Sequence, residues 1–183
     1  MIFKKTNLDG SYQILPLPNI DERGWFLRSF CKNEFKNINK NLSWVQLNHS
    51  FTKKKGSIRG LHYQNKPFTE IKLVKCIKGK VYDVIVDLRH NSPTYLKYYS
   101  LILSSKEKNM IYIPEGFAHG FQTLTNNCEL IYHHSNFYKK EYENGIRYDD
   151  KILSINWPIE PTNISSRDLS FKKIDVNFKS IKL

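Results

Sequence analysis

The feature that most constrains this chain is a hydrophobic pattern with a period of two over residues 81–88. Successive side chains of a β-strand point to opposite faces, so this period predicts a strand rather than a helix. The alternation gives the segment two faces, one with Val81, Asp83, Ile85 and Asp87 and the other with Tyr82, Val84, Val86 and Leu88.

Similar short runs recur along the chain, separated by turn signals such as Lys78-Gly79-Lys80 and Asn91-Ser92-Pro93. Helical patterns are limited to residues 32–37, with one further turn of helix at residues 104–108. Many short strands at this spacing indicate an all-β sandwich or barrel with a few short helices. The further strands are predicted over residues 72–77, 98–103, 110–113, 120–124 and 129–134.

Length and composition predict one domain over residues 1–183, because 40% of the 183 residues are hydrophobic and no linker divides them. The tail at residues 171–183 is expected to be a late strand or a peripheral, partly ordered end. No apolar stretch has the length of a signal peptide or a membrane span, so we expect a cytoplasmic protein without a membrane partner. Cys31, Cys76 and Cys128 are widely spaced and odd in number, which predicts free thiols.

The formal net charge of +12 means that an anionic partner has to be considered. The lysines are spread along the chain, and no helix-turn-helix, zinc-finger or RNA-recognition motif is present, so nucleic acid is not the expected partner. A solvated, lysine-rich surface explains most of the charge. A basic cleft would also suit the pyrophosphate of a nucleotide.

Three regions concentrate residues that a simple core does not need. Residues 21–28 combine charges with aromatic rings, although a turn that opens an edge strand explains the same pattern. Residues 113–121 form a Pro and Gly turn that leads to His119, and the turn alone does not explain the histidine.

The richest region joins residues 46–50 to residues 57–64. Strict alternation puts Arg59 and His62 on opposite faces of a strand. On the neighbouring strand it aligns three polar side chains on one face, those of Gln46, Asn48 and Ser50. Polar groups that converge inside a barrel mark a binding site, whereas an isolated histidine is more often a hydrogen-bonded structural residue.

A metal site is one interpretation of these histidines. Metal-binding cupins use a His-x-His pair, a carboxylate a few residues later and a distant third histidine. His62, Glu70 and His119 stand at about the right places, but Gln64 occupies the position of the second histidine and is a poor ligand. A metal-dependent cupin oxygenase or isomerase is therefore the alternative, and the expectation is a site without metal or other cofactor.

Taken together, the motifs resemble the cupin nucleotide-sugar 3,5-epimerases, typified by dTDP-4-dehydrorhamnose 3,5-epimerase. The resemblance covers most of the chain, with the motifs in the right order and spacing. It implies a jelly-roll homodimer that epimerises a nucleoside-diphosphate 4-keto-6-deoxy sugar at C3, C5 or both, for deoxysugar or surface-polysaccharide synthesis. The motifs include Asp21-Glu22-Arg23-Gly24, Gln46-Leu47-Asn48-His49-Ser50, Arg59-Gly60-Leu61-His62-Tyr63-Gln64, Gly145-Ile146-Arg147-Tyr148-Asp149-Asp150 and Ser166-Arg167-Asp168.

The resemblance also implies catalytic roles. His62 would remove the proton next to the sugar ketone, with Asp168 as its orienting partner. Lys72 would stabilise the enolate oxygen, and Tyr132 would return a proton to the opposite face. Such groups are needed because a proton beside a ketone is a very weak acid, so the base must be held in one tautomer and the developing charge must be stabilised.

For substrate binding, the resemblance implies a further set of side chains: Arg23, Phe26, Arg28, Gln46, Asn48, Arg59, His119, Tyr138, Glu143 and Arg167. Arg28 departs from the family, which has a glutamate there that helps to hold the nucleoside, so the nucleobase stays open. Glu70, Leu47 and Arg167 stand where glutamine, aspartate and lysine are usual. A non-catalytic nucleotide-sugar or nucleic-acid binding module is a further alternative. A module that keeps the pocket without catalysis would be expected to lack the base, the enolate stabiliser or the acid, and a nucleic-acid binder would show salt-dependent association with oligonucleotides.

Overall fold

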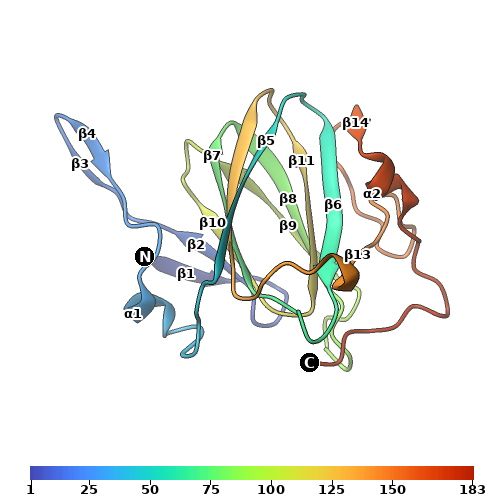
Figure 1. Cartoon of the computed structure of the whole chain (residues 1–183). Coiled ribbons are helices and arrows are strands. Elements are labelled where there is room, and N and C mark those ends of the chain that lie inside the picture. Colours follow the sequence, from blue (N-terminus) through green and yellow to red (C-terminus); the bar gives the residue numbers. More distant parts are fainter.

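The computed structural model describes residues 1–183 and consists mainly of two β-sheets that face each other (Figure 1). In order across the first sheet, the strands are β1 (Ile2–Lys5), β2 (Tyr12–Leu15), β10 (Met110–Ile113), β7 (Lys72–Lys78), β12 (Cys128–His134) and β5 (Gln46–Thr52). The second sheet runs β13 (Glu143–Gly145), β6 (Ser57–Gln64), β11 (Phe117–Thr123), β8 (Lys80–Asp87) and β9 (Tyr98–Ser104), with β14 (Asn163–Ile164) beside β6. This arrangement confirms the predicted all-β cupin jelly roll.

The remaining elements lie outside the two sheets. A hairpin of β3 (Asn19–Asp21) and β4 (Gly24–Phe26) projects from the body of the molecule (Figure 1). The helices are short: α1 (Lys32–Phe35), the 3₁₀ turn η1 (Lys140–Tyr142) and α2 (Ser166–Ser170). No helix has the length and hydrophobicity needed to cross a membrane.

Strand β8 confirms the period-two pattern. Val81 and Ile85 are buried between the two sheets, and Val84 and Val86 are buried on the outer face of the second sheet. The strand is therefore central, with apolar partners on both sides.

The other predicted strands are present with shifted ends. Strand β11 begins at Phe117 rather than at residue 120, because Phe117, Ala118 and His119 already pair with β8. The turn of helix predicted at residues 104–108 is a single turn, in which the Lys108 N–H donates to the Ser104 carbonyl over 2.8 Å.

The outer core of the second sheet is covered by the C-terminal part of the chain. Ile174 and Ile181 are buried in this core, and Ile181 forms a single bridge with Arg89. The tail is thus packed against the sheet without forming a regular strand. All three cysteines are free, and Cys76 and Cys128 are packed in the core between the sheets.

Candidate active site

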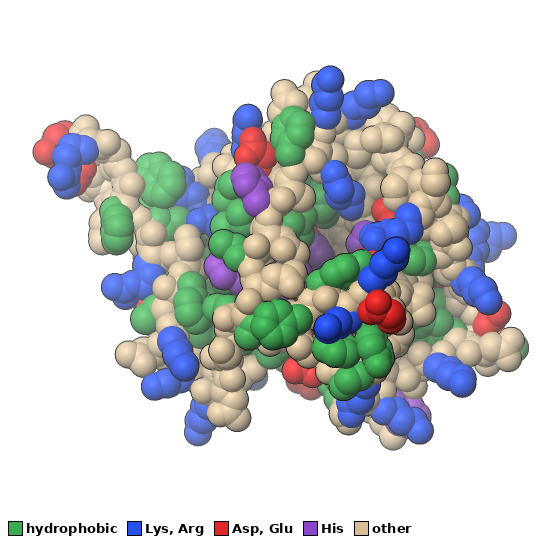
Figure 2. All heavy atoms as spheres, in the orientation of Figure 1, with side chains coloured by type: hydrophobic (Ala, Val, Ile, Leu, Met, Phe, Trp, Pro, Cys, Tyr) green, Lys and Arg blue, Asp and Glu red, His purple; other side chains and the backbone are tan.

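A cavity of about 520 Å³ opens between the two sheets and is lined from both of them. The space-filling view shows a hollow with histidine side chains inside it, while Lys and Arg are scattered over the visible face (Figure 2). Strands β5, β7 and β12 supply one wall, and strands β6 and β11 supply the other. The cavity therefore brings together residues far apart in the sequence.

A bulge in β6 decides which side chains enter the cavity. His62 pairs with His119 and Arg59 pairs with Phe121, so β6 has one residue more than β11 between these two points. Arg59 and His62 consequently both line the cavity, and the strict alternation predicted for this strand is wrong here. Gly60, with φ +119°, lies inside the bulge, and a Cβ there would be 2.6 Å from the Gly120 Cα.

His62 and Asp168 form an imidazole–carboxylate pair at the wall formed by β6. The His62 Nε2 lies 2.8 Å from Asp168 Oδ1, and the Gly60 N–H donates to Asp168 Oδ2 over 3.2 Å. Burial raises the pKa of Asp168, but the hydrogen bond and charge of His62 and the Gly60 N–H outweigh it and lower the pKa overall. An ionised Asp168 keeps a proton on Nε2 and leaves the Nδ1 lone pair as a base.

Helix α2 delivers Asp168 to this position. The Ser165 hydroxyl caps the helix by accepting from the Asp168 N–H over 3.1 Å. Arg167, the neighbour of Asp168, contacts His62 Nε2 with Nη2 at 3.1 Å and donates from Nη1 to Glu143 over 2.8 Å. Because a guanidinium can only donate, we assign the hydrogen bond of the Nε2 proton to Asp168.

Tyr132 enters the cavity from β12, on the wall opposite β6. Its hydroxyl lies 2.9 Å from the Ser50 Oγ on the neighbouring strand β5. Burial raises the pKa of Tyr132 well above its usual value, so the phenol keeps its proton. A protonated phenol and an imidazole base thus stand on opposite walls of one cavity.

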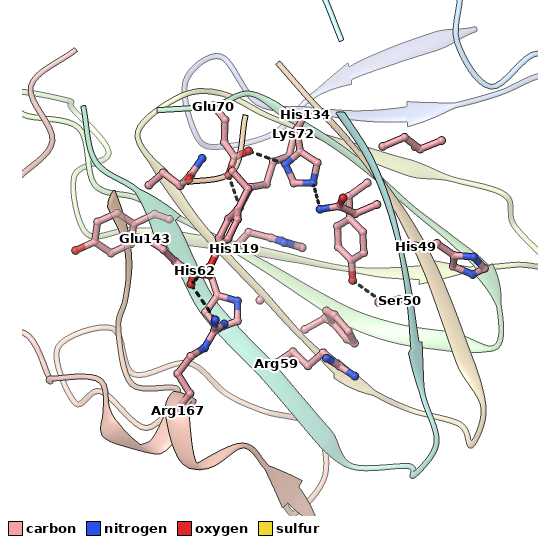
Figure 3. Close-up of a pocket in the computed structure, with 18 residues that line it drawn as sticks. His49, Ser50, Arg59, His62, Glu70, Lys72, His119, His134, Glu143 and Arg167 are labelled. Carbon is pink, nitrogen blue, oxygen red and sulfur yellow. Dashed lines mark hydrogen bonds and ion pairs between the residues drawn. The ribbon is translucent and has the colours of Figure 1, made fainter. Parts of the chain in front are cut away.

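Lys72 lies at the start of β7, on the same wall as Tyr132. Its Nζ is 3.3 Å from Glu70 Oε1, and the other oxygen of Glu70 is 2.6 Å from His134 Nδ1. Burial raises the pKa of Glu70, but the charge of Lys72 and the hydrogen bond with His134 outweigh it, so the pKa is lowered overall. The close-up shows Glu70, Lys72 and His134 gathered at one end of the cavity (Figure 3).

His119 and Arg59 occupy the wall formed by β11 and β6. The His119 Nε2 lies 2.9 Å from Asp83 Oδ2, and both side chains are buried. Arg59 is anchored through Nε to Thr52 Oγ1 and through Nη2 to the Phe51 carbonyl, each over 3.0 Å. A fixed guanidinium beside a histidine can bind an anionic oxygen of a ligand.

The rim of the cavity is held by polar contacts. The Tyr138 hydroxyl donates to Glu143 Oε2 over 2.9 Å, the oxygen that Arg167 also binds. Gln46 accepts from the Tyr138 backbone N–H over 3.1 Å and donates to Asn48 over 3.2 Å. Asn48 and Ser50, from the polar face predicted for β5, line the cavity, as do Leu47 and His49 from the other face of this edge strand.

Arg23, Phe26 and Arg28 are not brought to the cavity. Arg23 lies on the projecting β3–β4 hairpin and forms an ion pair with Asp21. Phe26 is 72% exposed, and Arg28 forms an ion pair with Glu34. Within a single chain, these predicted binding residues are therefore separate from the others.

The three residues proposed above as metal ligands do not converge. His62 is paired with Asp168, His119 with Asp83, and Glu70 with His134 and Lys72. No three His, Cys, Asp or Glu side chains are grouped so that they could hold a metal ion. The donor set does not fit the alternative of a metal-dependent cupin.

Sequence reasoning gave no role to His134 or Asp83. His134 follows Tyr132 by two residues in a strand, so the period of two places it on the same face as Tyr132. Asp83 is one of two carboxylates in the largely apolar pattern of residues 81–88, and it is 0% exposed in the structure. Both signals were present in the sequence, but their partners Glu70 and His119 are close only after folding.

The fold and the cavity define a class of protein: a cupin jelly roll with a cavity lined by imidazole, phenol, lysine and carboxylate side chains from both sheets. The model of the family dTDP-4-dehydrorhamnose 3,5-epimerase matches residues 5–175. The dTDP-4-dehydrorhamnose 3,5-epimerase of Shigella flexneri is 42% identical over 160 residues, which are 86% of this chain and 88% of that protein.

Solved structures agree. The crystal structure of dTDP-4-dehydrorhamnose 3,5-epimerase from Elizabethkingia anophelis has a TM-score of 0.92 and 38% identity, and the match covers 97% of this chain and 99% of that one. The epimerase from Legionella pneumophila in complex with dTDP-4-keto-L-rhamnose has a TM-score of 0.91 and 36% identity, covering 97% of this chain and 94% of that one. The chain belongs to the dTDP-4-dehydrorhamnose 3,5-epimerase family, and it is an epimerase of the isomerase class.

Proposed function

We propose that this protein epimerises a nucleoside-diphosphate 4-keto-6-deoxy sugar, similar to dTDP-4-dehydro-6-deoxyglucose, at C3, C5 or both. The observation that carries the proposal is the placement of a His62–Asp168 pair and a protonated Tyr132 on opposite walls of one cavity. Inversion of a carbon requires removal of a proton from one face and its return to the other face. The product would serve deoxysugar or surface-polysaccharide synthesis in the cytoplasm.

In the proposed mechanism, the free imidazole nitrogen of His62 takes the proton from the carbon beside the ketone. The electron pair of that C–H bond moves to the ketone oxygen and forms an enolate, while Asp168 stabilises the imidazolium. Lys72 Nζ donates to the enolate oxygen inside the cavity, where a fixed cation acts strongly. Tyr132 then gives its proton to the opposite face of the carbon, and exchange with solvent restores both groups.

For binding, we propose that Arg59 and His119 contact the diphosphate or sugar oxygens, and that Gln46, Asn48 and Tyr138 contact the nucleotide side of the substrate. Glu143 and Arg167 bridge the rim beside Tyr138. The charge of Arg59 is fixed by two hydrogen bonds to β5, which suits a ligand with several anionic oxygens.

We further propose a homodimer in which the β3–β4 hairpin of one copy reaches the cavity of the other. The hairpin projects into solvent with exposed apolar side chains, Ile20 at 78% and Phe26 at 72% (Figure 1). Strand β5 lies at the open edge of the first sheet, beside the cavity, with Leu47 and Phe51 exposed. Exposed apolar groups on two separate parts of one chain favour their burial against a second copy.

The test is incubation with dTDP-4-keto-6-deoxyglucose in heavy water, followed by NMR and mass spectrometry. Deuterium at C3 and C5 is the result expected of a 3,5-epimerase, and deuterium at one carbon is that of a single-site epimerase. A His62→Ala variant is the control and should incorporate none. If the wild-type protein incorporates none either, with dTDP or with GDP, CDP and UDP analogues, the proposed function is wrong.

A further inference from the structure

Two buried residues of the cavity, Glu70 and His134, take no part in the proposed proton transfers. Glu70 contacts Lys72 at the start of β7 and His134 (Figure 3). His134 in turn contacts Asn48 on β5. All three side chains at this end, those of Glu70, His134 and Lys72, are at most 10% exposed. A buried group with charge must be paired and hydrogen-bonded, so the contacts here constrain one another.

The direction of each hydrogen bond follows from one backbone group. The Tyr138 N–H can only donate, so it fixes Gln46 Oε1 as the acceptor at 3.1 Å. Gln46 Nε2 then donates to Asn48 Oδ1 over 3.2 Å, which leaves the amide nitrogen of Asn48 to donate to His134 Nε2 over 3.2 Å.

An accepting Nε2 means that the proton of His134 is on Nδ1. That proton is donated to Glu70 Oε2 over 2.6 Å, and the other oxygen of Glu70 accepts from Lys72 Nζ at 3.3 Å. His134 is thus a neutral imidazole with one nitrogen donating and one accepting. The bonds form a continuous chain from the Tyr138 backbone to Lys72.

We propose that Glu70 and His134 are positioning residues. Through this directed hydrogen-bond chain they hold Lys72 Nζ at the place in the cavity where it donates to the enolate oxygen. The proposal rests on the proposed function, since it gives Lys72 the role of enolate stabiliser. A lysine side chain has several rotatable bonds, and a buried carboxylate fixed on its other side by His134 restricts the ammonium to one place. Gln46 and Asn48, the two residues of β5 that are proposed to bind the nucleotide side of the substrate, belong to the same hydrogen-bond chain.

The neutral state of His134 depends on the groups around it. The titratable or charged groups near it are Glu70 just before β7, Lys72 at the start of β7, Tyr132 and His133 from its own strand, and His62 and His119 across the cavity. From β5, the group that faces it is the neutral amide of Asn48. A second proton on His134 would meet the N–H of that amide and break the chain at this bond.

Two variants interrupt the chain at different places. In Glu70→Gln, an amide nitrogen replaces one of the two carboxylate oxygens, so either Lys72 or His134 faces a donor in place of its acceptor. In His134→Phe, a ring of similar size replaces the imidazole, and the donor to Glu70 is lost. We expect kcat to fall by about tenfold to a hundredfold in each, the loss that a small misplacement of a catalytic group produces, with KM nearly unchanged. Because both act through one chain, the double variant should lose no more than the worse single variant.

The matched control is His133→Phe, the same exchange one residue earlier, where the ring packs against Trp44. It should retain wild-type kcat, and thermal unfolding should show all four variants folded. The positioning proposal would be overturned by a wild-type kcat in either single variant, or by losses that multiply in the double variant. The proposed function would still stand in that case, because it is tested by the activity of the wild-type protein.

A second measurement does not depend on turnover. Long-range ¹H–¹⁵N spectra of the histidine rings, assigned with His134→Phe, should show His134 as the neutral Nδ1–H tautomer near neutral pH. An Nε2–H tautomer or an imidazolium at His134 would contradict the assigned direction of the hydrogen bonds and overturn the proposal. This readout separates failure of the positioning proposal from failure of the proposed function, which the absence of deuterium exchange in the wild-type protein would reveal.

Discussion

The Tyr132 hydroxyl lies 2.9 Å from the Ser50 Oγ, and this contact between neighbouring strands fixes the phenol on the wall opposite His62. Burial raises the pKa of Tyr132, so its proton is retained throughout the neutral range. A phenol in this state is an acid that can give its proton only to a strongly basic centre, such as the carbon of an enolate.

The first prediction concerns the Tyr132→Phe variant, which lacks only the hydroxyl. His62 should still remove the proton and return a deuteron from heavy water to the same face. We expect deuterium in the substrate with the configuration retained, and formation of the inverted sugar reduced by about 10²-fold to 10⁴-fold. NMR of the recovered sugar separates the two outcomes, and inverted product at the wild-type rate would remove Tyr132 from the acid role.

Much of the fold could be predicted from the period of two. Val81 and Ile85 face the inner core and Val84 and Val86 the outer one, as their alternation indicated. The alternation failed in β6, because the bulge at Gly60 brings Arg59 and His62 to the same side. A pattern of side chains cannot show an extra residue in one strand, since that depends on the pairing with β11.

The site was less accessible to sequence reasoning than the fold. The proximity of His62 and Asp168 was implied by the resemblance, and the structure brings the two within 2.8 Å. The contact of Glu70 with His134 joins residues 64 positions apart; Glu70 was considered only as a metal ligand and His134 was given no role. Arg23 shows the opposite case: the motif that contains it was evident, but the projecting hairpin separates it from the cavity of its own chain.

The second prediction is that the Asp168→Asn variant, whose new side chain has nearly the same size and shape, loses most of its catalytic activity. The side-chain amide introduced by this substitution can donate to His62 Nε2 and so favour the proton on Nδ1, where the base is needed. We expect kcat to fall by about 10²-fold to 10⁴-fold with a small change in KM. Steady-state kinetics check this, and a proportionate rise in KM at constant kcat would indicate a binding role instead.

The third prediction concerns stability in acid, again through Asp168. Its pKa is lowered from the usual value of 3.8 by the contacts with His62 and Gly60, which outweigh burial. A carboxyl with a lowered pKa contributes stability above its unfolded-state pKa and loses that contribution as the pH falls through the folded-state pKa. Urea unfolding between neutral pH and about pH 3 should therefore show a smaller acid loss in Asp168→Asn than in the wild-type protein, and equal losses would contradict this.

The fourth prediction tests the bulge. Gly60→Ala combines a φ of +119° with a Cβ that would lie 2.6 Å from the Gly120 Cα. We expect the free energy of unfolding to fall by about 1–3 kcal/mol or more. Activity should fall as well, because Arg59 and His62 shift. Gly24→Ala is the matched control for stability, because Gly24 has a φ of +125° and nothing within 4 Å of its Cβ position. Equal losses in the two variants would mean that backbone conformation alone, and not the contact with β11, matters.

The fifth prediction tests whether two copies build one site. A His62→Ala copy keeps its hairpin but has an inactive cavity, and an Arg23→Ala/Phe26→Ala copy keeps its cavity but lacks the hairpin side chains. If the hairpin serves the partner's cavity, a mixed dimer contains one complete site. Random pairing of equal amounts, assayed well below KM, should then restore about a quarter of the wild-type activity.

The control for this mixture is the pair His62→Ala and Tyr132→Phe, whose changes lie in the same cavity of each chain. Every cavity in that mixture lacks one catalytic group, so no activity should return. Light scattering and native mass spectrometry establish that the mixed dimers form. If mixed dimers of the first pair form but activity is not restored, Arg23 and Phe26 do not serve the cavity of the partner. If the protein is a monomer at the assay concentration, there is no shared site.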